Sequence, residues 1–274
     1  MNEKAIYDRP SDAVAEDQRP SNPFEEGVVL GFDKPYGWTS FDVVGKVRWA
    51  LCRYLGVKKL KVGHAGTLDP LATGVMIVCT GRATKQIDEL QAHTKEYVAT
   101  LRIGATTPSF DLEHPIDAIY PTEHINRQLV ETVLKQFLGR IEQIPPAFSA
   151  CKVDGKRAYR LARQGKEVEL KAKTLIIDEI ELIDGPTPFG LTPGLSPNER
   201  GTQDGLSITI RVVCSKGTYI RALARDIGQA LNSGAHLTAL RRTRVGNIRV
   251  EECLNVTEWC ERLLKSKVES QKSI

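Results

Sequence analysis

Residues 63–75 read GHAGTLDPLATGV, and they are the most informative stretch of the chain. Three glycines and Pro70 predict a loop between two apolar segments, one that presents its side chains instead of burying them. Pro70 also disfavours helical backbone at the residue before it, so the carboxylate of Asp69 is held on extended chain. An Asp-Pro pair in an arbitrary loop is more often a turn than a site. Asp69 is therefore a candidate catalytic residue whose role the loop alone leaves open.

Several common chemistries do not fit this loop. It lacks the GKS or GKT ending of a phosphate-binding P-loop, and it contains no HExxH metal pair. It has no second carboxylate two residues after Asp69. Glycoside hydrolases need two carboxylates that flank the scissile bond, and no partner lies near Asp69 in sequence, although folding could supply one. One lone aspartate remains as the chemical group of the loop.

The segments around the loop predict strands and helices without the regular order of βαβ units. Strands are indicated by apolar runs or by alternation with period two, at residues 28–32, 75–79, 97–103 and 206–212. Helices are indicated by apolar residues at helical spacing, at residues 40–55, 125–138 and 220–231. This pattern predicts an α+β fold with a mixed, mostly antiparallel central sheet flanked by helices and loops.

The chain is expected to divide into three parts. Residues 1–27 contain seven acidic and three basic side chains, three prolines and few large apolar groups, so we expect a disordered acidic tail. Residues 28–250 are expected to form the main domain. Within it, the five glycines and four prolines of residues 185–205 predict an irregular surface insertion. Residues 251–274 are expected to form a short C-terminal tail.

The composition excludes some classes of protein. The 274 residues have a net charge of +4, and residues 28–274 alone carry 35 basic minus 27 acidic groups, or +8. A basic domain fits nucleic-acid or phosphate partners, and equally a solvated surface without them. The longest apolar runs are too short to span a bilayer, and the N-terminus lacks a secretory pattern. The six cysteines include no CxxC pair, so we expect a cytoplasmic protein with reduced thiols and without a zinc site.

Together with five further motifs, the loop at 63–75 resembles the TruB family of tRNA pseudouridine synthases. One matching motif would be weak support, whereas six motifs in order, from residue 32 to residue 246, are strong support. The five further motifs are FDKPYGWTS (32–40), KEYV (95–98), IPPAFSACKVDGKRAYRLARQG (144–165), GTYIRALARDIG (217–228) and AHLTALRRTRVG (235–246).

The resemblance implies an enzyme with the pseudouridine synthase fold, an isomerase that converts uridine 55 in the T loop of tRNA to pseudouridine. It implies that Asp69 is the catalytic aspartate and that Arg221 pairs with it. It implies that Tyr97 stacks on the flipped uracil and assists proton removal at C5, although without the family match Tyr97 reads as a strand tyrosine packed in the core. A carboxylate can attack C1′ or remove a sugar proton to form a glycal, and the sequence leaves both mechanisms open.

The resemblance also assigns residues to RNA binding. Those expected around the flipped nucleotide are His64, Tyr219 and Leu240, with Lys34 and Pro35 as a supporting motif. Residues 144–174 match an RNA-gripping loop of the family, and residues 151–173 carry eight Lys or Arg against three acids. The cations expected on the RNA backbone are Lys152, Lys156, Arg157, Arg160 and Arg163. A charge run of this kind is also typical of a solvated helix face.

The expected partner is the T arm of tRNA, and we expect a monomer without cofactor, catalytic metal or membrane contact. Many family members continue into an RNA-binding domain of the PUA type, whereas 25 residues follow Arg249 here. We therefore expect that domain to be absent or reduced to a helix around residues 257–264. Two other functions stay open, a noncatalytic tRNA-binding or tRNA-folding protein and a glycosylase or hydrolase that releases free uracil. The presence of Asp69, Tyr97 and Arg221 together favours the isomerase.

Overall fold

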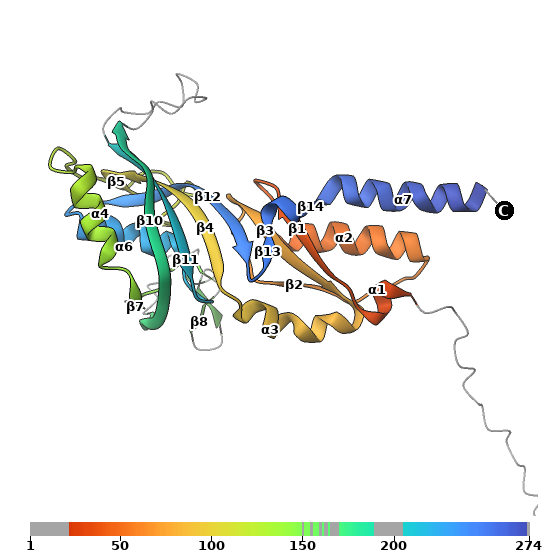
Figure 1. Ribbon diagram of the computed structural model, residues 1–274. Coiled ribbons are helices and arrows are strands. Elements are labelled where there is room, and N and C mark those ends of the chain that lie inside the picture. Colours follow the sequence, from red (N-terminus) through yellow and green to blue (C-terminus); the bar gives the residue numbers. More distant parts are fainter. Residues whose placement is uncertain are drawn as a thin grey trace, which may run out of the picture.

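The computed structural model describes residues 22–149, 151–153, 156–158, 161, 164, 170–188 and 205–272 (Figure 1). The helices are α1 (Pro23–Glu26), α2 (Ser40–Leu55), α3 (Ile87–Ala92), α4 (Arg127–Lys135), α6 (Ile220–Ala230) and α7 (Val256–Lys272), with 3-10 turns η1 (Gly81–Gln86) and η2 (Val250–Glu252). The strands are β1 (Val29–Lys34), β2 (Val62–Ala65), β3 (Ala72–Thr80), β4 (Lys95–Ile103), β5 (Ala105–Thr106), β6 (Ala118–Ile119), β7 (Gly139–Gln143), β8 (Lys152–Val153), β9 (Lys156–Arg157), β10 (Lys173–Pro188), β11 (Leu206–Cys214), β12 (Ala235–Val245), β13 (Ile248–Arg249) and β14 (Leu254–Asn255). Within these residues no helix is both long and apolar enough to cross a membrane.

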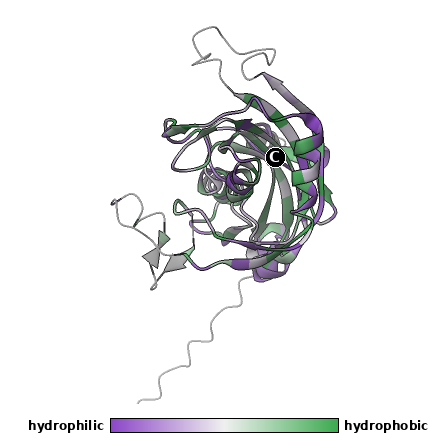
Figure 2. Ribbon diagram, turned by 90° about the vertical axis from the view of Figure 1, so that its left-hand side faces the viewer, coloured by the Kyte–Doolittle hydropathy of each residue, from purple (hydrophilic) through white to green (hydrophobic). Residues whose placement is uncertain are grey.

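One large mixed sheet organises the described part of the chain. Its strand order is β14-β1-β3-β12-β4-β11-β10-β7, with β2 added beside β3 and β13 beside β12. The pairs β1·β14 and β3·β12 are parallel, and the other neighbouring strands are antiparallel. The predicted α+β class with a mostly antiparallel sheet is thereby confirmed. Viewed end-on, the sheet is strongly curved, and the short β8–β9 hairpin stands apart from it (Figure 2).

The predicted periodicities place side chains in two principal cores. In β4, Tyr97, Ala99 and Leu101 are buried while the residues between them are half-buried, as period two requires. They share a core with α6, whose Leu223 and Ile227 are fully buried on the predicted helix face. A second core lies between α2, α7 and the strands β1 and β3.

The C-terminal residues, expected to form a short tail over 251–274, include β14 and α7, and both pack on the main body. β14 pairs with β1, and α7 lies alongside α2 with Val256 and Cys260 buried between them (Figure 1). The helix expected around residues 257–264 is present and extends from Val256 to Lys272. The apolar face of α7 packs against α2. This burial stabilises the helix more than its length alone could.

The expectation of a disordered tail over residues 1–27 is wrong for its last six residues. Asn22 caps α1 by accepting a hydrogen bond from the backbone N–H of Phe24, and Pro23 stands in the first turn. The Phe24 ring packs edge-on against Tyr54 and Trp259, at centroid distances of 6.5 and 6.3 Å. A single aromatic anchor orders this short segment despite its polar composition. Residues 1–21 lie outside the described part.

The expectation of an irregular insertion over residues 185–205 is wrong for residues 185–188, which belong to β10. β10 continues through Gly185 and Pro186 to Pro188, still paired with β11. The register shifts near Asp184 and Thr187, and these bulges let a Gly-Pro stretch remain in a ladder that would otherwise exclude proline. Residues 189–204 lie outside the described part.

The glycine-rich loop is shorter than residues 63–74, because β2 and β3 extend into it from both ends. Gly74 lies within β3 at φ +105°, and a Cβ there would stand 2.1 Å from the carbonyl oxygen of Arg242 on the neighbouring strand β12. A larger residue could adopt neither this backbone nor this approach. Gly74 therefore brings β12 against the start of β3, immediately beside Asp69.

Candidate active site

Asp69 lies in the loop between β2 and β3, and its side chain is 40% exposed. The buried side chain of Lys34 holds this loop. Its Nζ donates to the carbonyl oxygen of Pro70 in the loop at 3.3 Å, and to those of Pro35 and Trp38 at 3.0 and 2.6 Å. Burial lowers the pKa of Lys34 to about 8, and the nearby Asp69 carboxylate opposes part of that shift. The Lys-Pro motif therefore supports the Asp69 loop, because Lys34 donates to the carbonyl oxygen of Pro70, the residue after Asp69.

The first residue of α2 holds the same loop from the other side. The Oγ of Ser40 accepts a hydrogen bond from the Leu68 N–H at 2.9 Å and donates to the Leu68 carbonyl oxygen at 3.1 Å. Ser40 is 3% exposed, so water cannot replace these bonds. Since Leu68 directly precedes Asp69, the position of the carboxylate depends on them.

Replacement of Ser40 with Ala is expected to destabilise the fold by about 1–3 kcal/mol and to lower kcat at least tenfold, because two buried groups beside Asp69 lose their partner. Thr39→Ala is the matched control. It removes an exposed helix cap and should cost about 1 kcal/mol, yet it touches nothing in the loop. Urea unfolding and single-turnover kinetics measure the two effects. Equal kcat for the two variants would contradict a positioning role for Ser40.

Arg221 brings the candidate residues of two distant segments together. It stands in the first turn of α6 with 5% exposure, and its Nε donates to Oδ2 of Asp69 at 2.8 Å. Its two Nη atoms donate to the carbonyl oxygens of Ser109 and Phe148, at 3.1 and 2.9 Å. The guanidinium is therefore fixed by three bonds, and it orients the carboxylate without shielding it from solvent. The pairing expected between Arg221 and Asp69 is present in the structure.

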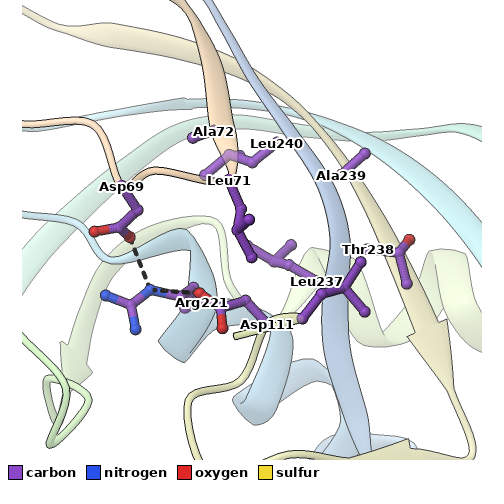
Figure 3. A pocket seen from close by; sticks show the side chains of 10 residues that line it. Asp69, Leu71, Ala72, Asp111, Arg221, Leu237, Thr238, Ala239 and Leu240 are labelled. Atoms are coloured by element: carbon purple, nitrogen blue, oxygen red, sulfur yellow. Dashed lines mark hydrogen bonds and ion pairs between the residues drawn. The ribbon is translucent and has the colours of Figure 1, made fainter. Parts of the chain in front are cut away.

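A second carboxylate, which the sequence did not single out, shares this arginine. Oδ2 of Asp111 lies 3.6 Å from the Arg221 Nε, and Asp111 is 6% exposed (Figure 3). Its loop includes Phe110 at φ +60°, an uncommon conformation for a bulky residue, and such outliers cluster at functional sites. Asp111 belongs to no motif recognised in the sequence, so only folding could reveal it.

A pocket opens between the two carboxylates and an apolar wall (Figure 3). It is small and open to solvent, with about 290 Å³ of space between the lining atoms, the solvent at its mouth included. Its lining combines a few polar groups with a hydrophobic majority: Asp69, Leu71, Ala72, Asp111, Leu112, Arg221, Leu237, Thr238, Ala239 and Leu240. Leu240 pairs with Ala72 across the parallel β3·β12 contact, so the sheet itself sets this wall against Asp69.

Tyr97 lies one row of residues beyond the pocket wall and does not line it. It pairs with Arg242 in the neighbouring strand, two positions along from the Leu240·Ala99 pair, and is 8% exposed. Burial raises the pKa of the Tyr97 phenol, and the Arg242 guanidinium opposes this, so the phenol keeps its proton at neutral pH. Arg242 is itself fully buried, and its Nε donates to the Val75 carbonyl oxygen at 2.8 Å.

His64 lies in β2, outside the pocket lining. Its ring meets Phe41 of α2 edge-on at 6.0 Å, and its Nδ1 is buried without a hydrogen-bond partner in the described part of the chain. Burial lowers its pKa, a hydrogen bond with the Gly66 backbone opposes that shift, and the Arg242 guanidinium adds to it, so the imidazole is neutral near pH 7. It is therefore a flat, uncharged ring beside the Asp69 loop.

Tyr219 occupies the N-cap position of α6 without a side-chain cap bond, and it is not among the residues that line the pocket. Gln143 holds its backbone through two hydrogen bonds, and its hydroxyl lies 3.2 Å from the Sγ of Cys151. Burial opposes ionisation of that thiol, yet hydrogen bonds from Tyr219 and Ser149 and the nearby Lys173 lower its pKa below the usual value. Burial raises the pKa of Tyr219.

The basic segment is described in part. Lys152, Lys156 and Arg157 belong to the β8–β9 hairpin, of which the structure describes the backbone at these positions but not the side chains. Arg160 and Arg163 lie outside the described residues. The predicted RNA-gripping role of these five cations stays a prediction.

Two family models cover most of the chain. Residues 53–220 match the N-terminal domain of TruB family pseudouridylate synthases, and residues 221–271 match the C-terminal domain of tRNA pseudouridylate synthase B. The tRNA pseudouridine synthase B of Phocaeicola vulgatus is 68% identical over 246 residues, which are 90% of this chain and 97% of that protein. The one from Flavobacterium johnsoniae is 49% identical over 239 residues, 87% of this chain and 96% of that protein.

Solved structures share the architecture. A chain from a crystal structure of a Cbf5-Nop10-Gar1 complex superimposes with a TM-score of 0.59 at 28% identity, over 87% of this chain and 54% of that one. A chain from an H/ACA RNP bound to a substrate RNA containing 2′-deoxyuridine gives a TM-score of 0.60 at 24% identity, over 93% and 63% of the two chains. The fold is that of the pseudouridine synthases, a class of isomerases. Within that class, the chain belongs to the TruB family.

Proposed function

We propose that this enzyme converts uridine 55 in the T loop of tRNA to pseudouridine, with Asp69 as the catalytic residue. The observation that supports this most is the Asp69 carboxylate, held by a buried arginine at the mouth of a small, mostly apolar pocket. The curated relatives are named tRNA pseudouridine synthase B, in agreement with tRNA as the substrate.

The reaction exchanges one bond of the nucleotide for another. The C1′–N1 bond breaks, the uracil turns without leaving, a C1′–C5 bond forms, C5 loses its proton, and N1 ends protonated. Asp69 can attack C1′ and leave again, or it can remove a sugar proton to give a glycal and later return it. Either way the carboxylate must be held in place, and the bond from Arg221 fixes it.

Access to the pocket requires that the base leave its stack. A flipped base needs an apolar wall and a flat partner, and Leu237 and Leu240 supply the wall. His64, neutral and beside the catalytic loop, is suited to hold a neighbouring nucleotide by stacking. Tyr97 lies behind the wall, so its proposed contact with the base requires the uracil to reach deeper than the open pocket.

Chromatography of the nucleosides of an unmodified tRNA transcript, after incubation with the protein, tests this proposal. Pseudouridine at position 55, and its absence from a transcript with cytidine at that position, are the expected results. Free uracil would identify a glycosylase, and unchanged uridine with tight tRNA binding would identify a noncatalytic binding protein. A modified uridine elsewhere in the tRNA would reject position 55 as the target.

Replacement of four cations of the basic segment by Ala should weaken tRNA binding without a matching loss of chemistry. Each phosphate contact contributes a slope of about 0.7–0.9 to the dependence of log affinity on log salt. Alanine at Lys156, Arg157, Arg160 and Arg163 should therefore flatten that slope by up to about three, measured by filter binding over a range of salt concentrations. Single-turnover rates at saturating enzyme should fall much less than affinity. Wild-type affinity and slope in a folded variant would show that the segment is a solvated surface.

A further inference from the structure

One exposed face of α2 has the composition of a nucleic-acid site. Phe41 and Trp49 are 72% and 49% exposed, and they stand two turns apart, about 80° from each other around the helix. An open groove of about 910 Å³ lies along them, lined by Trp38, Phe41, Asp42, Gly45, Lys46 and Trp49. These six residues and Arg53 are called the α2 surface below. Exposed aromatic side chains that lie along one groove are typical of an interaction site, whereas single exposed hydrophobic residues are common on any protein surface.

Gly45 keeps the groove open, and this glycine lowers the stability of α2. Gly45 lies in the middle of α2, where glycine is less stable than alanine. A Cβ at this position would meet nothing within 4 Å, so packing does not require a glycine. The residue instead leaves room between Phe41 and Trp49.

The charges of this region favour a polyanion. Residues 36–61 contain six Lys or Arg and one acid, Asp42, whose carboxylate is occupied by both the N–H and the hydroxyl of Thr39. Lys46 and Arg53 lie over the Trp49 ring, at 5.7 and 5.4 Å from its centroid. This cation–π arrangement holds both positive groups on the open side of the helix.

The α2 surface begins at the catalytic loop. The Phe41 ring touches His64, and the residue before it, Ser40, is bonded to Leu68 beside Asp69. From Phe41 to Trp49 the helix rises about 12 Å, the length of three or four stacked nucleotides at about 3.4 Å each. The α2 surface therefore starts next to residues that contact the Asp69 loop.

We propose that the α2 surface binds unpaired nucleotides of the same RNA whose uridine occupies the Asp69 pocket. Phe41 stacks on a base, and Lys46 and Arg53 pair with the phosphates that follow. This inference rests on the proposed function and adds a second RNA contact to it. RNA fits better than a protein partner or a second copy, because the centres of protein interfaces are depleted of lysine and this groove is bordered by cations.

The test compares affinities for an unmodified tRNA transcript by filter binding over a range of salt concentrations. Phe41→Ala should weaken binding at least fivefold, and Phe41→Tyr should restore it, since stacking on an aromatic ring contributes strongly to single-strand binding. Gly45→Leu should weaken binding while thermal stability is kept or raised, because it fills the groove and removes a helix glycine. Lys46→Ala with Arg53→Ala should flatten the salt slope by about 1.4–1.8.

A matched double variant, Lys85→Ala with Lys135→Ala, removes two exposed cations from η1 and α4 and should keep the wild-type slope. If wild-type protein forms pseudouridine while the α2 variants bind like this control, the inference fails and the proposed function stands. If wild-type protein forms none in any tRNA, the proposed function fails. A wild-type dimer in sedimentation that Phe41→Ala dissociates, with tRNA affinity unchanged, would assign the surface to a second copy and overturn the inference.

Discussion

Replacement of Asp69 with Asn is expected to abolish pseudouridine formation and to leave tRNA binding nearly unchanged. The amide keeps the volume of the side chain but can neither attack C1′ nor accept a sugar proton, and loss of a catalytic nucleophile typically costs about 10⁴–10⁶ in kcat. The fold should survive, because Arg221 retains the carbonyl oxygens of Ser109 and Phe148 and the carboxylate of Asp111.

Two measurements and one control separate catalysis from binding in this variant. Single-turnover nucleoside chromatography should show no product over hours, while filter binding should give an affinity within a few-fold of wild type. Asp88→Asn removes an identical charge from the exposed first turn of α3 and should have no effect on either measurement. Product formed by the Asp69 variant at a near wild-type rate would reject Asp69 as the catalyst.

Much of the fold was predictable because its elements obey simple periodicities. The alternation around Tyr97 predicted β4, and the helical spacing of residues 40–55 predicted α2. The errors occur where one long-range contact outweighs composition. Phe24 orders α1 through aromatic contacts with residues 30 and more than 200 positions away, and no local pattern can show these contacts.

Some residues of the candidate site could likewise be singled out from the sequence, and others could not. Asp69 could be singled out from a short motif, because its loop has an unusual sequence. Asp111 could not, because its importance comes from the side chain it meets: Arg221 lies 110 positions later, and only the folded chain brings the two within 3.6 Å. The α2 surface could not be predicted either. The spacing of aromatic residues along a helix does not by itself show whether they face solvent or the core.

The structure also bears on the role proposed for Tyr97. A ring that is 8% exposed behind the pocket wall cannot receive a base on its whole face unless neighbouring side chains move. Burial raises the pKa of its phenol, so the phenol carries its proton at neutral pH and is not a base at rest. Before the phenol could take up the proton that leaves C5, its own proton would have to pass to an acceptor on the nucleotide, such as N1, which ends protonated.

Tyr97→Phe is accordingly expected to slow turnover by about 10²–10⁴-fold, the usual contribution of a general acid or base, with tRNA bound as tightly as before. Stability should change little, because the ring remains and Arg242 keeps its bonds to the carbonyl oxygens of Val75, Thr67 and Gly66. Deuterium at C5 of the target uridine should slow the variant further, because proton removal becomes the slow step.

The remote substitution Tyr120→Phe, outside the pocket lining, provides the matched control and should turn over normally with either isotope. If Tyr97→Phe instead keeps wild-type turnover, the hydroxyl is dispensable and the ring matters only as apolar filling beside Leu68 and Ala72. Tyr97→Leu then decides what the ring does. Loss of turnover in that variant would assign Tyr97 to the shape of the pocket, whereas normal turnover would remove it from the site altogether.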